Sequence, residues 1–194
     1  MTSISSLNFV HKLGKFGDYS EKEDHELLKV SEVNGLLIFQ IAKYNKSKFD
    51  VSEINIDGLN LPSPLKSSSN LNTRILWLGP DNWLVFSSIL DLIVKEKKQF
   101  DEANFAITNI SHSRTIIELE GNLVNEVLKK GCPLDVNTFK EGDCANSVYN
   151  GITITIDFIS NKPNKVRILG LRSFSESLYH SITDACLEFG YKAI

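Results

Sequence analysis

The chain contains few of the residues that build metal sites, disulfide frameworks and membrane spans. Its three cysteines, Cys132, Cys144 and Cys186, are odd in number and widely spaced, whereas zinc sites and disulfide frameworks use closer pairs. No apolar run approaches the ~18 residues of a transmembrane helix. We therefore expect three free, buried thiols and no membrane span.

A surplus of positive charge is also missing. The 21 Lys and Arg residues face 24 Asp and Glu residues, which gives a formal net charge of −3. Such a chain attracts phosphates and anionic lipids only weakly, so we expect neither nucleic-acid nor membrane binding. Residues 1–8 are polar and lack the basic start and apolar stretch of a secretory signal, so we expect a cytoplasmic location.

The sequence contains none of the common catalytic motifs. Gly14 and Gly17 stand in a polar segment and not between a strand and a helix, so they predict no phosphate-binding loop. Glu118 and Glu120 share one face of a predicted strand, which could serve acid–base chemistry. Alternating glutamates are, however, typical of a solvated strand face. We predict no catalytic, cofactor-binding or metal-binding residue in this chain.

What is present is the composition of an ordinary globular protein. Of the 194 residues, 42% are hydrophobic and 23% are charged. Residues 1–30 are polar and are expected to form an N-terminal arm, followed by a single α+β domain over residues 31–194. Glycine, proline and three consecutive serines predict a long loop over residues 57–72.

Short apolar runs and alternating patterns predict the elements of that domain. Strands are expected near residues 36–41, 75–78, 83–86, 105–110, 117–119, 152–158 and 166–171, and helices after Ser88, from Leu123 to Lys130 and from Ser173 to Phe189. From residue 83 onward the first five elements follow the split-βαβ order. We therefore predict an α+β fold of antiparallel sheets with helices packed on one face.

Two segments carry side chains suited to recognition. Gly79–Asn82 predicts a hairpin turn flanked by Trp77 and Trp83, which are either apolar anchors or walls of a cofactor cage; we favour the anchors. Ser111–Thr115 is either a plain turn or a site that binds a carboxylate, a phosphate or an acidic partner loop through Arg114. Arginine is scarce, with four residues against 17 lysines, and such sequences keep arginine where a planar donor group is needed.

Four blocks of the chain resemble the gamma subunit of heterotetrameric sarcosine oxidase. They are Arg74–Leu84 (RILWLGPDNWL), Ser111–Thr115 followed by Gly121, Lys130–Asp135 (KGCPLD), and Arg172–Leu178 with Glu188–Gly190. The blocks occur in the order of that family and extend over about residues 30–190. The sequence departs from the family at Asn82, where glutamate is usual, and in its polar N-terminal segment.

The resemblance implies a fold similar to the folate-binding domain of glycine-cleavage aminomethyltransferases. It also implies a non-catalytic gamma subunit, inactive alone, that supports assembly with alpha, beta and delta subunits. Such a complex oxidatively demethylates sarcosine to glycine, producing hydrogen peroxide and, with tetrahydrofolate, methylenetetrahydrofolate. FAD, FMN, NAD and tetrahydrofolate would be bound by the alpha and beta subunits and zinc by the delta subunit, with no cofactor in this chain.

In a non-catalytic subunit, the residues of interest are those that contact its partners. Tryptophan and arginine are over-represented at binding hot spots, and a specific interface buries more than ~1,000 Å². The candidate interface residues are Pro62, Trp77, Trp83, Ser111, His112 and Arg114. Two other functions stay open: a free-standing folate-binding or aminomethyltransferase-like one-carbon protein, and a self-contained adaptor with other partners.

Overall fold

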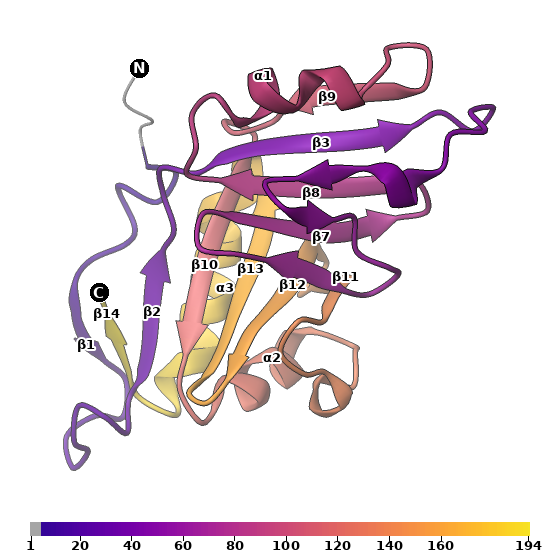
Figure 1. The fold of residues 1–194 in the computed structure, drawn as a ribbon. Helices are drawn as coiled ribbons and strands as arrows, with labels where there is room; N and C mark the ends of the chain where they lie inside the picture. The colour runs from indigo at the N-terminus through magenta and orange to yellow at the C-terminus, as the bar shows by residue number, and fades with distance from the viewer. Residues whose placement is uncertain (1–4) are drawn as a thin grey trace. The chain divides into compact units, whose positions relative to one another are not determined.

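The computed structural model describes residues 5–194, apart from the side chain of Lys97, and divides the chain into two compact units (Figure 1). The first unit holds the chain up to Asn34 and then His112–Ile194, and the second holds Gly35–Ser111. This division differs from the single domain expected over residues 31–194. The reason is that strand pairing within residues 35–111 closes a separate sheet with its own core.

The first unit is built on a seven-stranded sheet among the described residues. In spatial order its strands are β1 (Gly14–Phe16), β14 (Tyr191–Ala193), β2 (Leu28–Glu32), β10 (Arg114–Glu120), β13 (Asn164–Leu171), β12 (Ile152–Asn161) and β11 (Cys144–Tyr149). The β14–β2 pair is parallel, and the other neighbouring strands are antiparallel.

Two helices cover one face of this sheet. Helix α2 (Val124–Gly131) and helix α3 (Ser175–Leu187) share a core with alternate strand residues such as Ile117, Ile154 and Ile156. This alternation is the reason that β12 was predictable, since one side of the strand is apolar and must be buried. Short 3₁₀ turns at Val136–Thr138 and Arg172–Phe174 accompany the helices. The prediction of an α+β fold with helices on one face is confirmed for this sheet.

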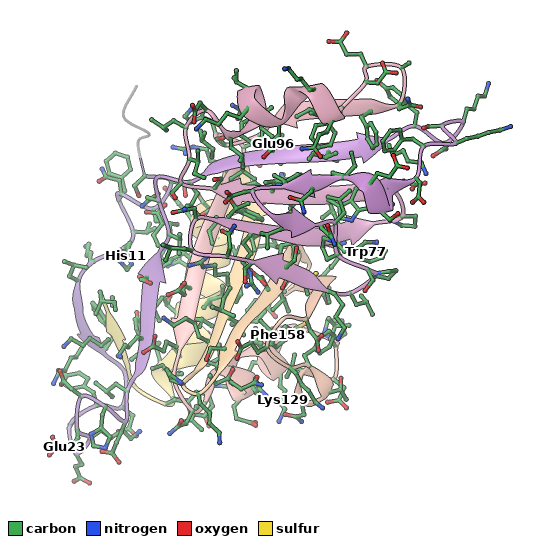
Figure 2. The ribbon with its side chains drawn as sticks, in the orientation of Figure 1. His11, Glu23, Trp77, Glu96, Lys129 and Phe158 are labelled. Atoms are coloured by element: carbon green, nitrogen blue, oxygen red, sulfur yellow. The ribbon has the colours of Figure 1, made fainter. Side chains whose placement is uncertain are left out.

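The N-terminal segment is part of the first unit and not an arm. Strand β2 inserts between β14 and β10, and Leu7 and Leu28 are buried in the core. The His11 ring, labelled in Figure 2, hydrogen-bonds the Tyr179 hydroxyl of α3 over 2.8 Å. The arm expected over residues 1–30 is therefore wrong for residues 5–30, and its first four residues lie outside the described part. Strands β1 and β2 have only three and five residues and flank a charged loop, which is why the sequence pattern did not reveal them.

The second unit has a five-stranded sheet among its described residues. In spatial order its strands are β6 (Ser67–Ser69), β7 (Thr73–Gly79), β8 (Asn82–Ser87), β3 (Leu37–Lys43) and β9 (Phe105–Asn109). Helix α1 (Leu92–Glu96) and the 3₁₀ turns Val51–Glu53 and Lys97–Gln99 surround a core around Ile41, Ile75 and Phe105. A separate hairpin joins β4 (Asn55–Ile56) to β5 (Leu59–Asn60).

The split-βαβ order is realised by fewer elements than expected. Strands β8 and β9 are both antiparallel to β3, which lies between them, so they are parallel to each other and joined through α1. Strand β10 and helix α2, expected to continue the motif, belong to the other unit. Pattern reading found the element order but could not tell that the chain changes sheets after residue 111.

Other local predictions were confirmed or corrected. The β7–β8 hairpin forms with Asp81 at φ +54°, and the three cysteines are free and buried. The expected loop over residues 57–72 contains β5 and β6, and the sequence analysis missed β11. The last helix was expected from Ser173 to Phe189, and α3 extends from Ser175 to Leu187. Within residues 5–194, no helix combines the length and the apolar character needed to cross a membrane.

Candidate interaction surface

Three of the six candidate residues meet at the β7–β8 hairpin. Trp77 and Trp83 are register partners across the two strands, and the Trp83 indole Nε1–H donates to the Pro62 carbonyl over 3.1 Å. Trp83 is only 4% exposed, whereas Trp77, labelled in Figure 2, packs on the same core and stays partly exposed. Trp83 is therefore an apolar anchor, and Trp77 and Pro62 are the members of this group that a partner could touch.

Ser111 acts as a structural turn residue. Its Oγ accepts from the backbone N–H of Ile38 over 2.8 Å and donates to Oδ1 of Asn109 over 2.7 Å. These bonds close the end of β9 against β3. Ser111 is the last residue of the second unit. The exposed His112 is the first residue of the segment in which the chain again belongs to the first unit. The segment Ser111–Thr115, expected to be a turn or a recognition site, thus contains the point where the chain passes from one unit to the other.

Arg114 begins β10, opposite Leu171 of β13. Its side chain is partly buried, and among residues 5–194 no carboxylate or other side-chain partner engages its guanidinium. Burial lowers the pKa of Arg114, because the loss of hydration disfavours the charged guanidinium. The group stays protonated, since arginine titrates far above neutral pH. A partly desolvated, unpaired guanidinium is chemically suited to receive a carboxylate from outside the chain.

The Glu118 and Glu120 carboxylates face a row of cations and not open solvent. Arg167 Nε donates to Glu118 over 2.8 Å, and Lys165 Nζ lies 2.6 Å from Glu120. Lys29 of β2 reaches Glu120 from the other side, over 2.7 Å. Hydrogen bonds from Lys165 and Lys29 lower the pKa of Glu120, which favours a permanently charged structural group.

This ion-pair ladder was missed in the sequence analysis, although a signal was present. Glu118 and Glu120 are separated by one residue on β10, and their partners Arg167 and Lys165 are separated by one residue on β13. Opposite charges that face each other across an antiparallel pair stabilise that pairing. The expectation of a solvated face is therefore wrong for these two glutamates, whose side chains are only 16% and 19% exposed.

Each unit has a surface hollow formed by described residues. One, of about 440 Å³, lies along α3 beside His180, Asp184 and Tyr191. The other, of about 580 Å³, lies between α1 and the edge strand β9 and is mainly apolar. Among the described residues no group of three or more His, Cys, Asp or Glu side chains is placed to hold a metal ion.

Comparison with solved structures defines the class of fold. The chain superposes on heterotetrameric sarcosine oxidase from Corynebacterium sp. U-96 in complex with pyrrole 2-carboxylate, with a TM-score of 0.74 and 22% identity over 86% of this chain and 87% of that chain. It also superposes on glycine cleavage system aminomethyltransferase T from Bartonella henselae, with a TM-score of 0.63 and 11% identity over 88% of this chain and 48% of that chain. The expected aminomethyltransferase-like fold is confirmed.

Sequence comparison gives the family. The chain is 27% identical over 138 residues to sarcosine oxidase subunit gamma of Corynebacterium sp. (strain U-96), and 28% identical over 128 residues to that of strain P-1. These alignments cover 68% and 63% of this chain and 66% and 61% of the relatives, so each spans less than two thirds of the relative's length.

The sequence profile of the sarcosine oxidase gamma subunit family matches residues 45–188, most of the chain, and the chain belongs to this family. The family resemblance predicted from the four sequence blocks is thereby confirmed. All six candidate interface residues lie inside the matched range.

Proposed function

We propose that this chain is the gamma subunit of a heterotetrameric sarcosine oxidase and that it contributes to assembly and not to bond-making. The observation that carries the proposal is the family match over residues 45–188. The two relatives named sarcosine oxidase subunit gamma and the superposed heterotetrameric sarcosine oxidase support the choice of this complex. The reaction of that complex would be the oxidative demethylation of sarcosine to glycine, with hydrogen peroxide and methylenetetrahydrofolate as further products.

In this proposal the partners are alpha, beta and delta subunits in the cytoplasm. FAD, FMN, NAD and tetrahydrofolate belong to the alpha and beta subunits and zinc to the delta subunit, and the isolated gamma chain is inactive. The arrangement of charged residues supports this assignment, because Glu118 and Glu120 are held in ion pairs and are poorly suited to proton transfer. In this proposal the chain acts by binding the other subunits through its surface.

The interface residues of the proposal are Trp77, Pro62, His112 and Arg114, with Trp83 and Ser111 holding them in position. Trp77 offers partly exposed aromatic area, and Arg114 offers a guanidinium without a partner in the described part of the chain. A carboxylate from another subunit that reached Arg114 would form a charge-assisted, bidentate pair. Partly desolvated arginine and tryptophan are the side chains that most often dominate binding energy.

Purification of the full, tagged chain from its native host tests the proposal. We expect three companion polypeptides and yellow flavin absorbance to co-purify. A colourless protein without companions would contradict the assignment, and so would sarcosine turnover by the chain alone. The alternative, a free-standing folate-binding protein, shares the fold, and it would be favoured by micromolar binding of tetrahydrofolate to the isolated chain in a calorimetric titration.

A further inference from the structure

The second unit has one protected sheet edge and one open edge. At one edge, β6 lies beside the β4–β5 hairpin, and Ser68 Oγ donates to the Asn60 carbonyl over 3.0 Å. Strand β9, at the other edge, has the sequence FAITN and contains neither proline nor a charged residue. Proteins usually block an exposed edge with such residues, so an unblocked edge is a site where another strand can pair.

The register of β9 determines which of its backbone groups are available. Tyr44 N–H donates to the Asn104 carbonyl, and Ile110 N–H donates to the Ile38 carbonyl. In an antiparallel ladder, alternate residues face the neighbouring strand, so the even-numbered residues of β9 face β3. The backbone groups of Ile107 and Asn109 therefore face the open side. The N–H of Phe105 faces it too, but already donates to the Asp101 carbonyl.

An apolar groove follows the same edge. Its volume is about 580 Å³, and its lining includes Tyr44, Ile93, Phe100, Phe105 and Ile107. Edge-to-face contacts with Phe49 and Phe100 hold the Phe105 ring in place. Figure 1 shows α1 beside β9, in agreement with the presence of Ile93 in the lining. The open edge thus combines directional hydrogen-bonding groups with a preformed apolar recess, which are the two requirements of strand addition.

We propose that an extended segment of another subunit pairs with β9 and places an apolar side chain in this groove, with an acidic residue beside the loop over residues 44–48. This inference rests on the proposed function, because it names a surface through which the gamma chain holds its partners. Main-chain hydrogen bonds at Ile107 and Asn109 supply the pairing. The groove selects the side chain, since alternate residues of an added strand point to the same face.

The charge at one end of β9 indicates the acidic residue. The loop over residues 44–48 lies against the start of β9, where Ser47 Oγ donates to Asn104 Oδ1 over 2.5 Å. Lys46 and Lys48 on this loop are exposed, and among residues 5–194 neither has a carboxylate partner. Two acids lie nearby: Asp101 already accepts from Ala103 N–H and the Asn104 amide, and Glu102 lies in the lining of the groove. An incoming carboxylate would find two available cations.

The same charges argue against a second copy of this chain as the occupant. If two β9 strands paired antiparallel about Ile107, Ile110 and Ser111 of the copy would approach the loop over residues 44–48. Neither residue carries a carboxylate, so Lys46 and Lys48 would gain no opposite charge from the copy. A different polypeptide with an acidic extended segment fits the edge better.

Hydrogen exchange on the full chain, free and in the co-purified complex, tests the proposal. We expect the amides of Ile107 and Asn109 to exchange at least about tenfold more slowly in the complex. If the companions co-purify and these two amides are unchanged, the inference is overturned while the proposed function stands. If no companions co-purify, both are overturned. Protection that grows with the concentration of the chain alone would assign the edge to a second copy and overturn the proposal.

Two pairs of variants extend the test. Ile107→Pro removes an outward N–H without breaking the ladder to β3, and we expect it to weaken association with the companion subunits about tenfold. Ile107→Val keeps this N–H and should assemble normally.

Lys46→Glu with Lys48→Glu should weaken association about three- to tenfold at low salt and much less at high salt. Lys140→Glu with Lys162→Glu changes the net charge equally on exposed loops of the other unit. Equal effects of the two charge pairs would contradict the proposal.

Discussion

Arg167 and Glu118 lie directly opposite each other on β13 and β10, and Arg167 Nε donates to Glu118 Oε2 over 2.8 Å. Lys165 extends the row by bridging Glu118 and Glu120, and Lys29 adds the third strand, β2. The ladder therefore fastens three adjacent strands of the first unit with partly buried charges. Removing one member leaves a carboxylate with fewer cations around it, which is more costly than the net gain of one ion pair.

The first prediction concerns this ladder. Arg167→Ala should lower the free energy of unfolding by about 1–3 kcal/mol, because Glu118 keeps only the longer contact with Lys165. Urea unfolding followed by circular dichroism measures the change. Lys140→Ala, on an exposed loop, is the matched control and should stay within about 0.5 kcal/mol of the wild type. Equal losses in the two variants would show that the ladder contributes nothing specific.

The second prediction concerns pH. Lys165 and Lys29 lower the pKa of Glu120 in the folded chain, so its stabilising contribution is present above the pKa of the unfolded chain and is lost as the pH falls through the lower, folded value. Unfolding free energies measured from pH 7 down to pH 3 should therefore decline less steeply for Glu120→Gln than for the wild type. Glu141→Gln, on an exposed loop, is the matched control for the removal of one carboxylate. Parallel curves for both variants would remove Glu120 from the acid response.

The third prediction separates the two tryptophans. Trp83→Ala should destabilise the chain by about 3–5 kcal/mol, because a buried ring and its bond to the Pro62 carbonyl are both lost. Trp77→Ala should cost less stability and should reduce recovery of companion subunits in co-purification. Thermal unfolding and co-purification of the two variants measure these effects. If Trp77→Ala assembles as well as the wild type, Trp77 is not at the interface.

The fourth prediction concerns Arg114. Arg114→Met keeps most of the side-chain volume and removes a charge that burial disfavours, so the stability of the isolated chain should be unchanged or higher. Association with the companion subunits should weaken about tenfold or more, as expected for the loss of an interfacial arginine. A calorimetric melt of the chain and a binding titration are both needed. A lower melting temperature with normal assembly would place Arg114 in a structural role.

The fifth prediction concerns Gly131 in the KGCPLD block. A Cβ atom at this position would lie 2.8 Å from the Tyr149 ring, and the Tyr149 hydroxyl is bonded to the Val127 carbonyl. Because the buried ring cannot retreat without losing that bond, Gly131→Ala should destabilise the chain by about 1–3 kcal/mol. Gly79→Ala is the control, since a Cβ there meets nothing within 4 Å. Chemical denaturation of both variants decides whether close packing explains this glycine.

Gly131 also shows that the role of a residue can depend on a strand far along the chain. It is the last residue of α2, and the cap position is Cys132. The glycine is required by Tyr149 of β11, a strand that the sequence analysis did not identify. The segment CANSVY has no clear alternation, so its strand conformation depends on pairing with β12.

The candidate interface was only partly predictable from the sequence. Residue type and position at a turn identify Trp83 and Arg114 as candidates. The sequence could not distinguish the buried Trp83 from the partly exposed Trp77, because both flank the same turn in apolar runs. Nor could it identify the open edge of β9, since the position of a strand within its sheet depends on pairings with distant segments.

The sequence by itself determined the α+β class, the β7–β8 hairpin, the last helix, the free thiols and the family. Each of these follows from turn residues, periodicity or short blocks that act within one element. Only the tertiary structure decided that the chain forms two units, that β2 pairs with β14, and that Glu118 meets Arg167. Those features depend on contacts between residues far apart in the chain, such as Leu28 and Tyr191. The local sequence pattern does not specify which distant strands will pair.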